Sequence, residues 1–142
     1  MFSKFNFPVT IEPNGEGGYI ASFRDVPEAL TEAPSLEDIK TAARDALITA
    51  IDFYIEDRRK FPAPSEPREG EFIVALPPSV EAKVLLLNAM VEANIRPSDL
   101  AKRMGISRQE VTRITDLHHA TKIDTIGTAL NSIGRRLELA VA

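Results

Sequence analysis

The chain has 142 residues, of which 44% are hydrophobic and 27% charged, and its formal net charge is −4. This balance is typical of one or two globular domains and excludes a disordered chain or a collagen. Because the sequence has no cysteine, a disulfide scaffold, thiol catalysis and cysteine-based zinc sites are excluded as well.

Two β-strands joined by a turn are predicted first, followed by a short third strand. Residues 5–12 alternate between apolar and polar side chains, which is typical of a half-buried strand. Residues 13–18 hold a proline, an asparagine and three glycines, so a turn is predicted there. Residues 19–23 return as the second strand of a hairpin, and residues 29–31 predict a short third strand.

A long amphipathic helix is predicted from residue 36 to about residue 56. Ser35 and Asp38 have the spacing of a capping box at its start. The apolar positions at helical spacing are Leu36, Ile39, Ala43, Ala46, Leu47, Ala50, Ile51 and Tyr54. This stripe predicts a helix that covers one face of a small sheet.

A fourth strand is predicted over residues 71–76, after a loop at 61–70 that contains three prolines. Both faces of this strand are largely apolar, which favours a buried position in the sheet. Pro77 and Pro78 end the strand and mark a predicted boundary between two domains, residues 1–78 and residues 79–142.

Four helices are predicted in the second domain, over residues 80–93, 98–104, 107–117 and about 121–133. Ser79, Ser107 and Thr121 are candidate N-terminal caps of three of these helices. Gly105 and Gly134 each follow a helix end, where glycine supplies a left-handed backbone. The expected fold class is α+β, a β-β-β-α-β domain followed by an all-α domain.

Residues 97–116 have the pattern of a helix-turn-helix. Ala101 is small enough for two helices to cross closely, and Gly105 allows the turn between them. The apolar side chains expected between the two helices are Leu100, Met104, Ile106, Val111 and Ile114. The alternative is a plain helical hairpin with a solvated polar face.

The outer face of the second helix of this motif is the candidate DNA-binding site. Arg108, Gln109 and Arg113 are expected to read bases, because arginine and glutamine contact guanine and adenine edges in the major groove. Thr112 is expected to contact a phosphate or a thymine methyl group, and Ser107 to place the helix N-terminus near a phosphate. Since a monomer would bind weakly, we expect a dimer that reads two half-sites.

Other clusters indicate no catalytic, metal or cofactor site. His118 and His119 are adjacent, so on a helix they point roughly 100° apart and do not readily share a metal ion. Asp38, Asp45 and Asp52 recur along the predicted long helix and are interpreted as a solvated face. We therefore expect no metal or cofactor site.

Charge divides unevenly between the two predicted domains. Residues 1–78 hold 8 basic and 14 acidic side chains, a net charge of −6. Residues 79–142 hold 9 basic and 7 acidic side chains, a net charge of +2. An acidic domain attracts a basic partner, and the second domain tolerates phosphate. No apolar run approaches the ~20 residues that span a bilayer. We also expect no secretory signal at the N-terminus, because an apolar run with a cleavage site is missing there. A cytoplasmic protein without a membrane partner is expected.

Several stretches resemble the HicB antitoxin family, along the chain from residue 7 to about residue 141. They are residues 16–19 (EGGY), 25–31 (DVPEALT), 46–50 (ALITA), 83–89 (KVLLLNA) and 117–124 (LHHATKID). The last two resemble the form of the family with a helix-turn-helix at its C-terminal end, where other members carry a ribbon-helix-helix.

The resemblance implies a partial, degenerate RNase H-like fold without nuclease activity for residues 1–78. This domain would bind a HicA-type toxin, a small basic mRNA interferase, and cover its active site. The C-terminal domain would bind operator double-stranded DNA and repress the operon, and the family forms dimers or higher oligomers. An RNase H-like nuclease needs a carboxylate inside its first strand, whereas here Glu12 comes only at the strand's end. We therefore expect no enzymatic activity.

Two other functions remain open from the residues. One is a stand-alone helix-turn-helix transcription factor with a ligand-sensing N-terminal domain, and the other is a metal-dependent nuclease. An adjacent reading frame for a short basic protein would favour the antitoxin. Metal-stimulated cleavage of RNA would favour the nuclease.

Overall fold

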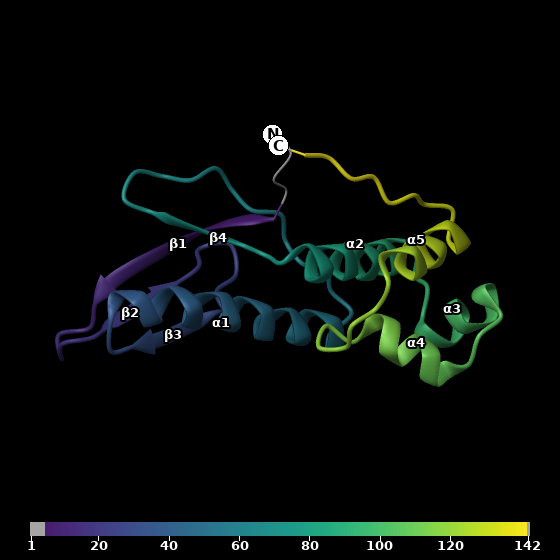
Figure 1. Ribbon diagram of the computed structural model, residues 1–142, viewed down its shortest axis with the longest axis horizontal. Helices are drawn as coiled ribbons and strands as arrows, with labels where there is room; N and C mark the ends of the chain where they lie inside the picture. The colour runs from purple at the N-terminus through teal and green to yellow at the C-terminus, as the bar shows by residue number, and fades with distance from the viewer. Residues whose placement is uncertain (1–4, 142) are drawn as a thin grey trace. The chain divides into compact units, whose positions relative to one another are not determined.

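The computed structural model describes residues 5–141, which divide into two compact units (Figure 1). The first unit runs to Tyr54 and resumes over Pro62–Leu76, while Ile55–Phe61 and the chain from Pro77 onwards form the second. Residues 1–4, where a secretory signal would begin, lie outside the described residues. By sequence the first unit has 5 basic and 12 acidic residues, a net charge of −7. The second unit has 12 basic and 9 acidic residues, a net charge of +3.

The first unit contains a four-stranded antiparallel sheet with the strand order β3-β2-β1-β4. Its strands are β1 (Asn6–Pro13), β2 (Tyr19–Ser22), β3 (Leu30–Ala33) and β4 (Phe72–Ala75). The predicted turn between β1 and β2 is confirmed, because Gly15 and Gly17 have φ values of 81° and 88° that favour glycine. Asn14 closes this turn, and its Oδ1 accepts hydrogen bonds from the N–H groups of Glu16 and Gly18 at 2.8 and 3.0 Å.

The prediction of a buried position for the fourth strand was wrong. β4 is an end strand of the sheet, next to β1, and its Phe72 and Ile73 are 41% and 45% exposed. Val74 is buried, and so is Leu76 just after the strand. Apolar residues on both faces therefore form a hydrophobic sheet edge here, rather than a strand buried between two neighbours.

Helix α1 (Leu36–Glu56) begins as predicted, because the Ser35 Oγ accepts a hydrogen bond from the Asp38 N–H at 3.1 Å. Its buried residues are Ile39, Ala43, Leu47, Ala50, Ile51 and Tyr54. Together with Phe7 and Val9 of β1 they belong to the buried apolar core. The prediction was wrong for Leu36, which is exposed in the first turn.

The second unit contains four helices, as predicted. They are α2 (Pro78–Glu92), α3 (Pro97–Met104), α4 (Arg108–Thr115) and α5 (Ile123–Ser132).

Two predicted caps were wrong. α2 begins at Pro78 with Pro77 as its N-cap, because proline at the first helical position already has a helical φ, and Ser79 lies inside the helix. α5 follows Lys122, since the Thr121 hydroxyl donates instead to the Arg113 carbonyl at 3.4 Å.

Candidate nucleic-acid interface

Helices α3 and α4 are joined by the predicted tight turn. Gly105 has φ 68° and ψ 35°, a left-handed backbone, and the Ile106 N–H donates to the Ala101 carbonyl at 3.0 Å. Of the apolar side chains predicted between the helices, Leu100, Val111 and Ile114 are buried, and Met104 and Ile106 pack against the same core. The turn and core of the predicted motif are therefore confirmed.

Four of the five residues predicted to contact DNA lie together on α4. Arg108, Gln109, Thr112 and Arg113 are all exposed. Because successive residues of an α-helix turn by about 100°, these four positions share the side of α4 that faces away from its buried residues. The arrangement presents two guanidinium groups and an amide to solvent within two helical turns.

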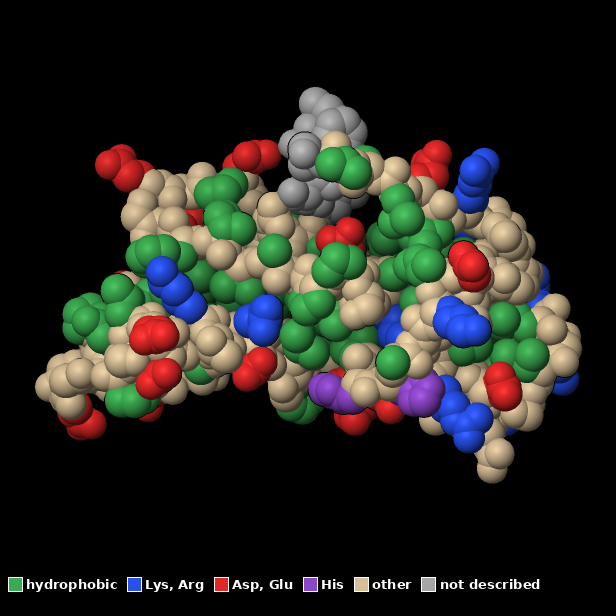
Figure 2. Space-filling model, viewed as in Figure 1, with side chains coloured by type: hydrophobic (Ala, Val, Ile, Leu, Met, Phe, Trp, Pro, Cys, Tyr) green, Lys and Arg blue, Asp and Glu red, His purple; other side chains and the backbone are tan. Residues whose placement is uncertain are grey.

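Ser107 is the N-cap of α4, as predicted. Its Oγ accepts a hydrogen bond from the Glu110 N–H at 3.1 Å. The Thr112 hydroxyl donates to the Arg108 carbonyl at 3.1 Å, which leaves its methyl group available for an apolar contact. On the face of the molecule seen in Figure 2, basic side chains lie among acidic ones and form no continuous basic patch.

Lys83 of α2 fixes the C-terminal end of α4. Its side chain is buried, at 2% exposure, and its Nζ donates to the carbonyls of Arg113, Asp116 and His119 at 3.2, 2.6 and 2.6 Å. These carbonyls lie at the end of α4 and in the loop that follows. A cation at this position interacts favourably with the negative end of the helix dipole. Burial lowers the pKa of the Lys83 ammonium, while the nearby Asp116 acts in the opposite direction.

Sequence reasoning missed this role of Lys83. The residue appeared only within the family-like stretch at 83–89. The signal that could have found it was a lysine between Ala82 and Val84, both apolar and both buried in the structure. A charged residue inside such a run is rarely buried without several hydrogen-bond partners.

The two histidines follow α4 in the loop that Lys83 holds. Both are exposed, and the His118 N–H donates to the Asp116 Oδ1 at 2.9 Å. Among residues 5–141 the structure has no group of three or more histidine, cysteine, aspartate or glutamate side chains that could hold a metal ion. Over the same residues no helix has the length and apolar character needed to cross a membrane.

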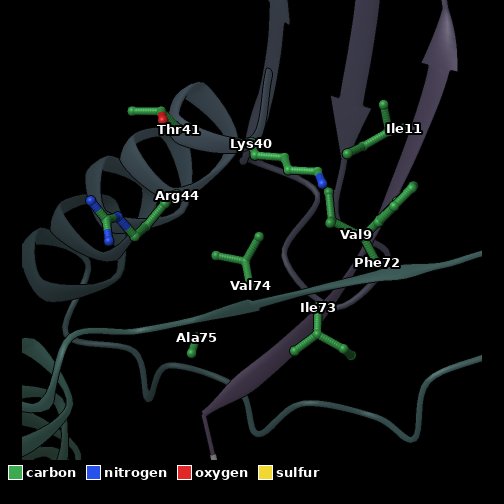
Figure 3. A pocket seen from close by; sticks show the side chains of 9 residues that line it. All are labelled: Val9, Ile11, Lys40, Thr41, Arg44, Phe72, Ile73, Val74 and Ala75. Carbon is green, nitrogen blue, oxygen red and sulfur yellow. The ribbon is translucent and has the colours of Figure 1, made fainter. Parts of the chain in front are cut away.

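The first unit has a groove of about 450 Å³ between α1 and the β4 edge of the sheet (Figure 3). Its lining residues are Val9, Ile11, Lys40, Thr41, Arg44, Phe72, Ile73, Val74 and Ala75. The Lys40 Nζ lies 5.2 Å from the centre of the Phe72 ring, a cation–π contact. The groove thus combines an apolar floor with two basic side chains from α1.

Comparison with known proteins gives a consistent result. Residues 6–85 match a family model described as a HicB-like antitoxin of a bacterial toxin–antitoxin system. The chain is 48% identical over 141 residues to "Antitoxin HicB 1" of Photorhabdus laumondii, which covers 99% of this chain and 90% of that protein. It is 46% identical over 135 residues to "Antitoxin HicB" of Escherichia coli, and the match covers 95% of this chain and 98% of that protein. It is 34% identical over 137 residues to "Antitoxin HicB" of Pseudomonas fluorescens, and the match covers 95% of this chain and 94% of that protein.

Proposed function

The chain belongs to the HicB-like antitoxin family of bacterial toxin–antitoxin systems, and on that premise we propose that it has two binding activities. The first unit binds and neutralises a HicA-type toxin, a small basic mRNA interferase. The second unit binds operator DNA as a dimer or higher oligomer and represses the operon. The protein does both in the cytoplasm and needs no cofactor.

The DNA-binding half of the proposal is carried by the outer face of α4. Its exposed Arg108, Gln109 and Arg113 have the side chains that make bidentate contacts with guanine and adenine. With Ser107 as the N-cap of α4, the N–H groups at the start of this helix would face a phosphate of the proposed operator complex. The hydrogen bonds of Lys83 hold the other end of the helix, and they would preorganise the proposed recognition surface.

The toxin-binding half is supported by the charge of the first unit. A net charge of −7 on this unit attracts a basic protein and raises its association rate, an effect that salt weakens. The second unit has the opposite sign, +3, and so is the part that tolerates a polyphosphate.

We propose binding rather than catalysis as the mode of action. Asp38 and Asp45 are exposed and lie seven residues apart on α1, which separates them by about 10 Å along the helix axis. Glu12 is exposed near the end of β1. Carboxylates that do not converge on one point give no support to the metal-dependent nuclease considered from the sequence.

The test compares two variants for operator binding and toxin neutralisation. Arg108→Ala and Arg113→Ala should each weaken binding to the upstream operator, by about 1–3 kcal/mol for the bidentate base contact that each removes, and should weaken binding to random DNA much less. Affinity is measured at one stated salt concentration, because it depends strongly on salt. Both variants should still relieve growth arrest by the toxin.

Arg59→Ala is the matched control, since it removes an exposed arginine of the same unit that lies outside α4. It should bind the operator as the parent protein does. If both α4 variants also bind like the parent, α4 is not the helix that reads the operator. If no short basic protein is encoded beside this gene, or if such a protein neither co-purifies with the chain nor is neutralised by it, the toxin-binding half is wrong.

A further inference from the structure

The loop between α4 and α5, residues 116–122, carries both histidines of the chain. It begins directly at the end of α4, where the Asp116 N–H donates to the Arg113 carbonyl at 3.3 Å. The Thr121 hydroxyl donates to the same carbonyl at 3.4 Å, so the far end of the loop also returns to α4. The loop therefore borders the part of α4 that carries Arg113, one of the side chains proposed to read bases.

Lys83 orders the backbone of this loop. Its Nζ donates to the carbonyls of Asp116 and His119 at 2.6 Å each, and to that of Arg113 at 3.2 Å. The His119 N–H donates in turn to the Asp116 carbonyl at 3.2 Å. While these carbonyls meet one buried ammonium group, the side chains of His118 and His119 are exposed at the surface (Figure 2, purple). The loop thus presents two imidazole rings beside α4 on an ordered backbone.

The charges of the exposed side chains around the two histidines cancel. α2 contributes only the buried Lys83, whose ammonium is bonded to the three carbonyls. The exposed charged side chains are Arg113 of α4, Asp116 of the loop, and Lys122 and Asp124 at the start of α5. Histidine is the side chain that ordinarily changes its charge between about pH 5 and 8. Protonation of the two imidazoles therefore decides whether the outside of this loop is neutral or positive.

The length of α4 brings this loop close to a DNA backbone in the proposed complex. α4 has eight residues and is therefore about 12 Å long. The major groove that would receive it is also about 12 Å wide, and sugar–phosphate backbones border it on both sides. Ser107 stands at one end of α4 and the 116–122 loop at the other. Contacts to phosphates at such positions fix the orientation of a recognition helix.

We propose that His118 and His119 contact phosphates of the DNA that α4 reads, and that they do so in their protonated form. This inference rests on the proposed operator binding and adds a pH dependence to it. An imidazolium has two N–H donors, and its charge-assisted hydrogen bonds to a phosphate are stronger than those of a neutral ring. Phosphates beside the rings favour the charged form in turn, so DNA binding should take up protons.

The first test measures DNA affinity of the full chain at about pH 8 and about pH 5.5, where histidine is mainly neutral and mainly charged. The probe is a duplex from the region directly upstream of the gene, at one salt concentration. The parent should bind about tenfold more tightly at the lower pH, because charge-assisted contacts form there. Circular dichroism at both pH values verifies that the chain is folded.

Two double variants bracket the parent. His118→Gln with His119→Gln has no charge at these positions, and at both pH values it should bind as the parent does at the higher pH. His118→Arg with His119→Arg is always charged, and at both pH values it should bind about as tightly as the parent does at the lower pH. Since the chain has no other histidine, these variants remove every imidazole from the protein.

The salt dependence of binding gives a second measurement. Each phosphate that a cation neutralises steepens the fall of log affinity with log salt concentration by about 0.9. The parent's slope should therefore steepen by about 0.9–1.8 per bound chain as pH falls, and that of the glutamine double variant should not. Lys122→Gln is the matched control, because it removes a permanent charge from the same loop and should leave the change with pH intact.

The inference and the proposed operator binding fail in different ways. If Arg108→Ala weakens operator binding at the higher pH, but the glutamine double variant keeps the parent's pH dependence, α4 reads the operator and the histidines are not contacts. A parent affinity that is equal at both pH values would overturn the inference as well. If the parent binds neither the upstream duplex nor a random duplex at either pH, both proposals are wrong.

Discussion

Lys83 shows how one buried charge can organise a neighbouring helix. It is the one charged side chain that is buried among residues 5–141, and its ammonium group meets three carbonyl oxygens. Those carbonyls belong to the end of α4 and the loop after it, where an α-helix leaves C=O groups without partners. The cost of removing the ammonium from water is offset by these three charge-assisted hydrogen bonds.

Lys83→Met should destabilise the second unit by about 3 kcal/mol, because it keeps the apolar stem but leaves buried carbonyls without a donor. Urea unfolding of the full chain measures the loss. Lys102→Met is the control, since Lys102 is exposed on α3 and its replacement should change the free energy of unfolding by less than about 0.5 kcal/mol. Equal effects of the two substitutions would contradict the role of Lys83 as a cap.

Glu71 makes the stability of the first unit depend on pH. Its carboxylate accepts hydrogen bonds from the Arg24 side chain, at 2.9 and 3.0 Å, and from the Arg68 N–H at 2.7 Å. These contacts lower the pKa of Glu71 below its ordinary value of 4.5, and the hydrogen bonds from Arg24 have the largest effect. The folded chain therefore releases this proton more readily than the unfolded chain. The resulting stability is present above the ordinary pKa and is lost as pH falls through the lowered one.

Glu71→Gln should accordingly lower the melting temperature at neutral pH, and the difference from the parent should shrink in acid, below about pH 4. Thermal melts over a pH series provide the measurement. Glu69→Gln is the control, because Glu69 is an exposed neighbour on the same loop. A difference between Glu71→Gln and the parent that is the same at all pH values would show that the carboxylate's charge is not involved.

At the level of elements, α1 depends on the sheet and α4 on the helices around it. Leu47 is fully buried in the middle of α1, and Leu100 is fully buried in α3. Each side chain contributes to a core that lies within one of the two compact units. Loss of either should therefore affect mainly the unit to which it belongs.

Leu47→Ala should lower the stability of the first unit by about 2–5 kcal/mol, the usual cost of a buried leucine-to-alanine change. Operator binding should persist at temperatures where toxin neutralisation is already lost. Leu100→Ala should give the reverse order. Differential scanning calorimetry follows the transitions, and if both substitutions lower every transition equally, the two units unfold as one.

For the whole molecule, the division of charge is sharper than the sequence boundary indicated. Assigning residues 55–61 to the second unit changes the two net charges from −6 and +2 to −7 and +3. The Asn88 side chain of α2 holds Phe61 in this unit, because it accepts from the Phe61 N–H at 2.8 Å and donates to its carbonyl at 3.2 Å.

A fragment of residues 1–78 should still neutralise the toxin, because it retains the sheet, α1 and the acidic surface. Its association rate with the toxin should fall as salt concentration rises. Co-expression with the toxin tests growth, and stopped-flow mixing measures the rate. Growth arrest that continues although the fragment is folded and soluble would show that the second unit is needed for neutralisation.

The sequence by itself determined the features that depend on neighbouring residues. Ser35 and Ser107 cap their helices, Gly105 makes the turn of the helix-turn-helix, and the apolar spacing of α1 predicts its buried face. The four exposed side chains of α4 follow from the same helical spacing. Each of these features depends on hydrogen bonds or periodicity within a few residues, which a sequence displays directly.

Only the tertiary structure decided the features that depend on residues far apart in the chain. The apolar pattern of β4 did not reveal that this strand lies at the edge of the sheet, because the pattern is the same whether one neighbour is present or two. Lys83 meets carbonyls about thirty residues later in the chain, and Asn88 meets Phe61 twenty-seven residues earlier. Such pairings depend on which elements the folded chain brings together, and no local propensity encodes that.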